Sequence, residues 1–196
     1  VSLVRRIGEF TFDLGNKEKK AQIFDCRPWV NAVGNKIAGK GYLDPTTYNI
    51  FPVTFGGIGN IHAVYKSFAT VLDSLETNTM ASNVIPWLKL LKSIMEGGVT
   101  VANHVSEGTS VIVNCSDGWD RTPQVISLAK IILEPYYRTL QGFRILLSYE
   151  WNGFGHKFCT RQQFSESDDK SPIFIQFLDL IHQIMLQHPN SFEFNK

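Results

Sequence analysis

Residues 109–124 read TSVIVNCSDGWDRTPQ, and this stretch decides the fold that the sequence predicts. Residues 109–114 are apolar and rich in β-branched side chains, which is typical of a short buried strand. Thr122 is the predicted N-cap of a helix and Pro123 its first residue. The apolar residues that follow recur with helical spacing on one face: Val125, Leu128, Ala129, Ile132 and Leu133.

Further strands and helices are predicted on both sides of this unit. Short strands are expected at residues 21–25 and 51–55. Helices are expected at residues 29–37, 61–75, 84–95, 136–149 and 174–185, and polar turns at residues 15–20 and 165–170. A strand, a tight loop and a helix, with more helices before and after, predict an α/β domain.

Composition limits the classes of protein to consider. The chain has 196 residues, 43% of them hydrophobic, which suits one globular domain. The net charge of +1 gives no general attraction for nucleic acid, so an anionic ligand would need local basic groups. Three scattered cysteines argue against a disulfide framework and favour a reducing, intracellular setting. No membrane span or signal peptide is evident. Because the sequence opens in mid-pattern at Val1, we expect it to belong to a longer protein.

The loop at residues 115–121 has the pattern Cys-x5-Arg and is a candidate phosphate-binding loop. A tight loop at a helix N-terminus aims unpaired N–H groups at one anion. Gly118 supplies the backbone freedom such a loop needs. Arg121 can hold two phosphoryl oxygens with its planar fork.

The same surroundings would activate Cys115 as a nucleophile. A helix N-terminus and an arginine lower the pKa of a thiol, and the thiolate is the reactive form. Cys115 is therefore expected to attack phosphorus, and water then hydrolyses the cysteinyl phosphate. This chemistry requires no metal or other cofactor, because Arg121 and the N–H groups stabilise the transferring charge.

The leaving alkoxide needs a proton donor, and two carboxyl groups lie in the loop. A carboxylate beside a phosphate dianion should have a raised pKa. Asp120 is the preferred general acid and Asp117 the second choice. An isolated Cys-x5-Arg also arises by chance, and buried cysteines are common core residues. The preceding strand, the glycine and the following helix favour the functional interpretation.

The loop and six other stretches resemble the myotubularin family of phosphoinositide phosphatases. The loop reads CSDGWDRT at residues 115–122. The others are DCRPWVNAVGNKIAGKG (25–41), GNIH (59–62), LEPYYRTLQGF (133–143), EWNGFGHKF (150–158), SPIFIQF (171–177) and FEFN (192–195). Because these motifs span most of the chain, the resemblance implies that residues 1–196 are part of one myotubularin-type phosphatase domain.

The resemblance implies a protein-tyrosine-phosphatase-like α/β fold with a central sheet flanked by helices. It implies removal of the 3-phosphate from phosphatidylinositol 3-phosphate and phosphatidylinositol 3,5-bisphosphate. Such proteins are cytoplasmic and act peripherally on endosomal and other intracellular membranes. They form homo- or hetero-oligomers through regions outside this chain. The PH-GRAM and coiled-coil regions common in the family are not recognisable here.

The resemblance also assigns roles to individual residues. It makes Cys115 the nucleophile, Arg121 the phosphate clamp and Thr122 a hydrogen-bond donor to the thiolate. The predicted substrate contacts are Asn35, Asn60, Ile61, Ser116, Asp117, Gly118, Trp119, Asp120, Arg121 and Lys157.

Three departures from the family pattern bear on function. Asn114 stands where many members have a histidine, which leaves the nucleophile less activated. Lys157 replaces an arginine and lacks its bidentate fork, while Pro123 replaces an alanine. A weakly catalytic phosphoinositide-binding adaptor is therefore the alternative function. A protein phosphatase with the same loop is a third.

Other candidate residues have plainer interpretations. His156 and Cys159 have a metal-site spacing but no second pair of ligands, so packing or surface roles are favoured. Cys26 is expected to be buried and structural. A structural role is favoured for Arg27, whereas Lys36 and Lys40 are equally compatible with a basic rim and with a solvated loop.

Overall fold

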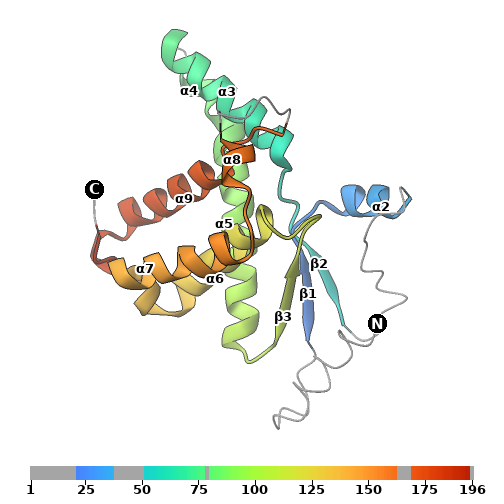
Figure 1. The fold of residues 1–196 in the computed structure, drawn as a ribbon. Helices are drawn as coiled ribbons and strands as arrows, with labels where there is room; N and C mark the ends of the chain where they lie inside the picture. The colour runs from blue at the N-terminus through green and yellow to red at the C-terminus, as the bar shows by residue number, and fades with distance from the viewer. Residues whose placement is uncertain (1–20, 38–50, 78–79, 163–168, 195–196) are drawn as a thin grey trace.

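A parallel sheet of three short strands organises the fold in the computed structural model, which describes residues 21–37, 51–77, 80–162 and 169–194 (for residues 35–37, 80 and 81 the backbone alone). The strands are β1 (Gln22–Asp25), β2 (Val53–Phe55) and β3 (Val111–Asn114), in the order β2-β1-β3 (Figure 1). In register, Ile23 of β1 lies opposite Val53 of β2 and Ile112 of β3. The three predicted strands are confirmed, each one or two residues shorter than expected.

The two faces of the sheet are both apolar, as expected for parallel strands. Phe24 faces the main core together with Val113, while Ile23 belongs to a smaller cluster with Ala21 and Phe51. This alternation follows from the two-residue period of a strand.

Helices make up most of the remaining described chain. They are α2 (Trp29–Ile37), α3 (Ile61–Thr77), α4 (Met80–Asn83), α5 (Ile85–Ser106), α6 (Arg121–Leu133), α7 (Leu140–Leu147), α8 (Phe158–Arg161) and α9 (Ile173–Gln187). The described part is therefore a mixed α/β structure, as predicted. Within it, no helix has both the length and the apolar character needed to cross a membrane.

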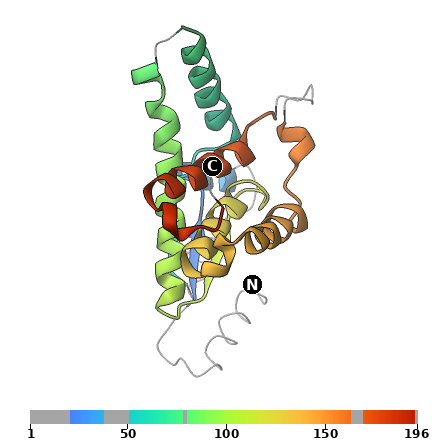
Figure 2. The same cartoon turned by 90° about the vertical axis from the view of Figure 1, so that its left-hand side faces the viewer.

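Helices α5 and α6 pack closely on each other beside β3 (Figure 1). Gly98 makes this approach possible, because a Cβ atom added there would lie 2.5 Å from the Leu128 side chain. Figure 2 shows α3 alongside one end of α5, and α9 packs against both. The α5–α6 pair fixes the position at which α6 meets the carboxyl edge of the sheet.

The start of α6 differs from the prediction that Thr122 is its N-cap. The helix begins at Arg121, Asp120 occupies the N-cap position, and the Asp120 side chain makes no capping hydrogen bond. Pro123 is thus the third helical residue instead of the first. Proline is tolerated there because N–H groups in the first turn have no partner within the helix.

The prediction of a single helix near residues 136–149 is also wrong. The chain forms a 3₁₀ turn (Pro135–Arg138), then α7, then a π-helical turn (Ser148–Gly153). Thr139 causes the break, since its hydroxyl accepts a hydrogen bond from the Gly142 N–H at 3.0 Å and starts a new helix. The predicted turns at residues 15–20 and, except for its last two residues, 165–170 lie outside the described residues.

Candidate active site

A polar cavity of about 660 Å³ lies where β3 ends and α6 begins. Its walls combine the loop with residues from distant segments. They are Arg27, Asn60, Ile61, His62, Cys115, Ser116, Asp117, Asp120, Arg121, Arg161, Asp169 and Ile173. Because Cys115 and Arg121 both line this space, an anion in the cavity can contact both.

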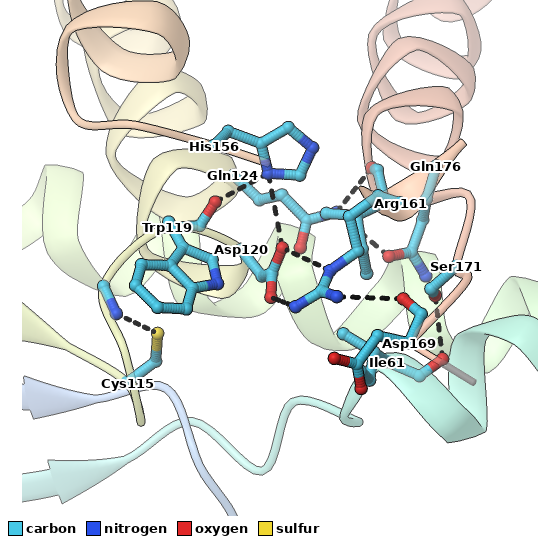
Figure 3. Close-up of polar contacts among 12 residues, drawn as sticks. Ile61, Cys115, Trp119, Asp120, Gln124, His156, Arg161, Asp169, Ser171 and Gln176 are labelled. Atoms are coloured by element: carbon cyan, nitrogen blue, oxygen red, sulfur yellow. Dashed lines mark hydrogen bonds and ion pairs between the residues drawn. The ribbon is translucent and has the colours of Figure 1, made fainter. Parts of the chain in front are cut away.

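The loop wraps around the Cys115 sulfur. The Gly118 N–H donates a hydrogen bond to Sγ at 3.2 Å (Figure 3). Gly118 has φ of +88°, a conformation that a side chain would strain, so the predicted need for glycine is confirmed.

The pKa of Cys115 is lowered from its ordinary value, as predicted. Burial acts in the opposite direction and is the largest single influence. The Thr122 hydroxyl and N–H, the Arg121 charge and the Gly118 N–H together outweigh it. The Thr122 hydroxyl oxygen is buried and has no other hydrogen-bond partner in the described part of the chain.

Arg121 holds its guanidinium in the same cavity. One Nη donates to the Ser116 hydroxyl at 3.0 Å and the other approaches the Ile58 carbonyl at 3.4 Å. These contacts join the end of the loop to its start and to the segment after β2. They hold the fork in place beside Cys115 before any anion binds.

Asp120 does not have the raised pKa that was predicted for a general acid. Burial would raise it, but hydrogen bonds from His156 and Arg161 and their charges lower the pKa below its ordinary value. Both carboxylate oxygens accept from Arg161, at 3.1 Å and 2.8 Å (Figure 3). Asp120 is therefore an ionised anchor for α8, whereas Asp117 is exposed at the cavity.

His156 helps to hold the loop from behind. Its Nδ1 lies 2.7 Å from the Trp119 carbonyl and 3.3 Å from the Asp120 carboxylate. Since a carbonyl only accepts, Nδ1 carries the proton. The packing role expected for His156 is confirmed, and Cys159 is exposed on α8. Among the described residues, no group of three metal-ligand side chains could hold an ion.

Of the other residues predicted to contact the substrate, only some lie at the cavity. Asn60 and Ile61 line the cavity, and the Asn60 side-chain oxygen caps α3 by accepting from the Ala63 N–H at 3.0 Å. Lys157 lies instead over the Trp119 ring, 4.2 Å from its centre, and neither residue lines the cavity. The side chains of Asn35 and Lys36 and the whole of Lys40 lie outside the described residues.

A family model for the myotubularin-like phosphatase domain matches residues 2–196. The chain belongs to this family. It is 42% identical over 184 residues to "Phosphatidylinositol-3-phosphate phosphatase MTMR7" of Pongo abelii, covering 89% of this chain and 28% of that protein. It is 40% identical over 195 residues to "Myotubularin" of Xenopus tropicalis, covering 94% and 32%.

A third relative in the family is "Phosphatidylinositol-3,5-bisphosphate 3-phosphatase MTMR8" of Homo sapiens. It is 45% identical over 184 residues, which are 89% of this chain and 26% of that protein. The chain thus spans about a third or less of the length of these relatives.

Arg161 is the main cavity residue that the sequence did not single out. It is buried on α8, pairs with Asp120 and donates to the Asp169 carbonyl at 2.9 Å. It follows the recognised stretch 150–158 by three residues, so extending that stretch would have included it. His62, Asp169 and Ile173 were also missed. Arg27 has the predicted structural role, in a buried ion pair with Asp25 at 2.7 Å, yet it also borders the cavity.

Proposed function

We propose that this chain is the catalytic core of a phosphoinositide phosphatase that removes the 3-phosphate from phosphatidylinositol 3-phosphate and phosphatidylinositol 3,5-bisphosphate. One observation supports this most directly: the Cys115 sulfur and the Arg121 guanidinium line the same polar cavity at the N-terminus of α6. The names of the relatives support the lipid substrate and the 3-position.

In the proposed mechanism, the Cys115 thiolate attacks the 3-phosphate in line, and the bond from phosphorus to the inositol oxygen breaks. Asp117 gives its proton to the departing alkoxide. Water then attacks the cysteinyl phosphate and releases inorganic phosphate and the thiolate, with Asp117 taking up a proton from that water. Arg121 and the loop N–H groups stabilise the charge of the phosphoryl group in both steps.

The proposal also covers the fold, the membrane association and the oligomeric state of the whole protein. It includes a protein-tyrosine-phosphatase-like fold, of which the parallel sheet and α6 are the part that carries the loop. It includes peripheral association with endosomal membranes and oligomerisation through regions outside this chain. The three arginines at the cavity, Arg27, Arg121 and Arg161, suit a headgroup with more than one phosphate.

The test is phosphate release by the intact protein from a panel of short-chain phosphoinositides. We expect release from the two 3-phosphorylated lipids and none from lipids phosphorylated only at other positions. Cys115→Ser should abolish release, whereas Cys159→Ser, at an exposed cysteine on α8, should leave it unchanged. A folded protein that releases no phosphate from any member of the panel would refute the proposal.

The adaptor alternative is supported by Asn114, which precedes the nucleophile. Its side-chain oxygen is buried without a hydrogen-bond partner, and no imidazolium stands there to stabilise the thiolate. Tight binding of the 3-phosphorylated lipids with undetectable release would establish this function instead. A tyrosine-phosphorylated peptide in the same panel tests the protein-phosphatase alternative, for which we expect no turnover.

A further inference from the structure

Cys26 lies directly opposite the candidate nucleophile Cys115. In the β1–β3 ladder, Gln22 pairs with Val111 and donates its N–H to the Ser110 carbonyl at 2.8 Å. The Cys26 N–H donates to the Asn114 carbonyl, also at 2.8 Å. The same offset makes Cys26 the partner of Cys115, one step beyond the last regular pair.

Paired residues on neighbouring strands point to the same face of a sheet. Cys26 and Cys115 accordingly both belong to the main core cluster, with Phe24 and Val113 on the same face. Neighbouring strands lie about 4.8 Å apart, and disulfides join Cα atoms separated by about 4.4–6.8 Å. A bond between these cysteines therefore requires side-chain rotation and no large backbone movement.

The two sulfurs also share their electrostatic surroundings. Thr122 and the Arg121 charge act on both thiols, and a negative charge on Cys115 raises the pKa of Cys26. Both thiols therefore respond to the same two residues at the start of α6.

The cysteines differ in access to solvent. Cys115 is 9% exposed and lines the cavity, whereas Cys26 is 0% exposed and does not line it. A small oxidant entering the cavity therefore meets Cys115 first. Burial is the main reason that the pKa of Cys26 is raised well above its ordinary value, whereas the pKa of Cys115 is lowered, so Cys115 forms the reactive thiolate more readily.

We propose that Cys26 is a resolving cysteine that forms a disulfide with Cys115 once a hydroperoxide has oxidised Cys115. The proposal rests on the reactive thiolate in the function proposed above and adds to it a reversible inactivation. A disulfide removes the nucleophile, and it also keeps Cys115 from further, irreversible oxidation.

The chemistry balances in two steps. The Cys115 thiolate attacks one oxygen of hydrogen peroxide, giving a sulfenic acid and hydroxide, so sulfur is oxidised and peroxide is reduced. The Cys26 sulfur then attacks the sulfenic sulfur, and the oxygen leaves as water with the Cys26 proton. The first step removes the negative charge on Cys115 that raised the pKa of Cys26, while Arg121 remains to stabilise a Cys26 thiolate. A dithiol such as dithiothreitol reduces this disulfide and restores both thiols.

The decisive measurement is disulfide mapping, which requires no lipid turnover. The intact protein is treated with graded hydrogen peroxide, free thiols are alkylated, and unreduced peptides are analysed by mass spectrometry. We expect a linked pair that contains Cys26 and Cys115, about 2 Da lighter than the two free peptides together. Absence of this pair while Cys115 becomes oxidised would overturn the proposal, and so would linkage of Cys115 to Cys159 instead.

A variant gives a second readout. After peroxide and then dithiothreitol, alkylation counts the Cys115 thiols that were recovered. Cys26→Ala should lower the recovered fraction several-fold, because the sulfenic acid proceeds to sulfinic and sulfonic acids. Cys159→Ser should recover like the wild type. Equal recovery in Cys26→Ala and wild type would contradict the proposal. If Cys26→Ala fails to fold, the linked peptide in the wild-type protein still decides.

Discussion

Thr122 is the residue whose substitution most directly tests the activation of Cys115. Its hydroxyl is among the groups that lower the pKa of Cys115. Thr122→Val keeps the shape but removes the hydroxyl, so the pKa of Cys115 should rise and less thiolate should be present at neutral pH. The measurement is the rate of Cys115 alkylation by iodoacetamide as a function of pH.

The midpoint of that pH profile should move to a higher value in Thr122→Val than in wild type. Thr160→Val, on α8, is the matched control and should leave the midpoint in place. An unchanged midpoint in Thr122→Val would show that Arg121 and the backbone N–H groups suffice to stabilise the thiolate.

The two loop carboxyl groups show the limit of prediction at the scale of single residues. The sequence identified both Asp117 and Asp120, since each lies within the recognised loop. It ranked Asp120 first, but the pKa of Asp120 depends on charges that arrive from elsewhere in the chain. His156 and Arg161, which follow Asp120 by 36 and 41 positions, reverse the predicted direction.

At the scale of elements, the Asp120–Arg161 ion pair joins the start of α6 to α8. The pair is buried, and one Nη–Oδ2 distance is 2.8 Å. Asp120→Asn leaves the Arg161 charge without its partner, so we expect a loss of about 3 kcal/mol in the free energy of unfolding at neutral pH. Urea unfolding measures this loss, with Asp73→Asn, exposed on α3, as the control.

The stabilisation from this pair depends on pH. The pKa of Asp120 is lowered in the folded protein, so its carboxylate contributes fully above the ordinary value of 3.8. The contribution should fall as pH drops below 3.8 toward the folded pKa, and wild type and Asp120→Asn should converge. A difference that stayed constant down to the lowest pH at which wild type remains folded would contradict this assignment.

Element boundaries were predicted well where local signals decide them. Helix α2 has the predicted limits. Its start follows Pro28 directly, so both the proline and the sequence pattern that predict it are local. Helix α6 begins one residue before the predicted N-cap. Arg121 is the first residue of the helix, and its side chain contacts Ser116 and Ile58. Helix-capping rules consider only local residues and do not include such contacts.

Across the whole molecule, Trp151 connects the elements behind the loop. It is 0% exposed, contacts His156, Phe174 and Phe177, and donates to the Ser127 hydroxyl at 3.2 Å. Trp151→Ala should lower the free energy of unfolding by about 3–5 kcal/mol, which is a large part of the stability of a typical domain.

Thermal unfolding followed by circular dichroism measures this effect. Trp29→Ala is the matched control because Trp29 is 58% exposed at the start of α2, and its loss should cost no more than about 0.5 kcal/mol. Equal effects of the two substitutions would mean that the aromatic cluster does not hold α8 and α9 to the core.

The amino-acid sequence was enough to predict the strand, the loop, the helix and the placement of Cys115 and Arg121 at one site. These two residues are six positions apart, so the geometry of one tight turn is enough to bring them together. The contact of Arg161 with Asp120 and the position of Cys26 opposite Cys115 became visible only in the folded structure. The first contact depends on where α8 packs, and the second on β1 and β3 being neighbours in the sheet. Both result from packing between segments far apart in the chain.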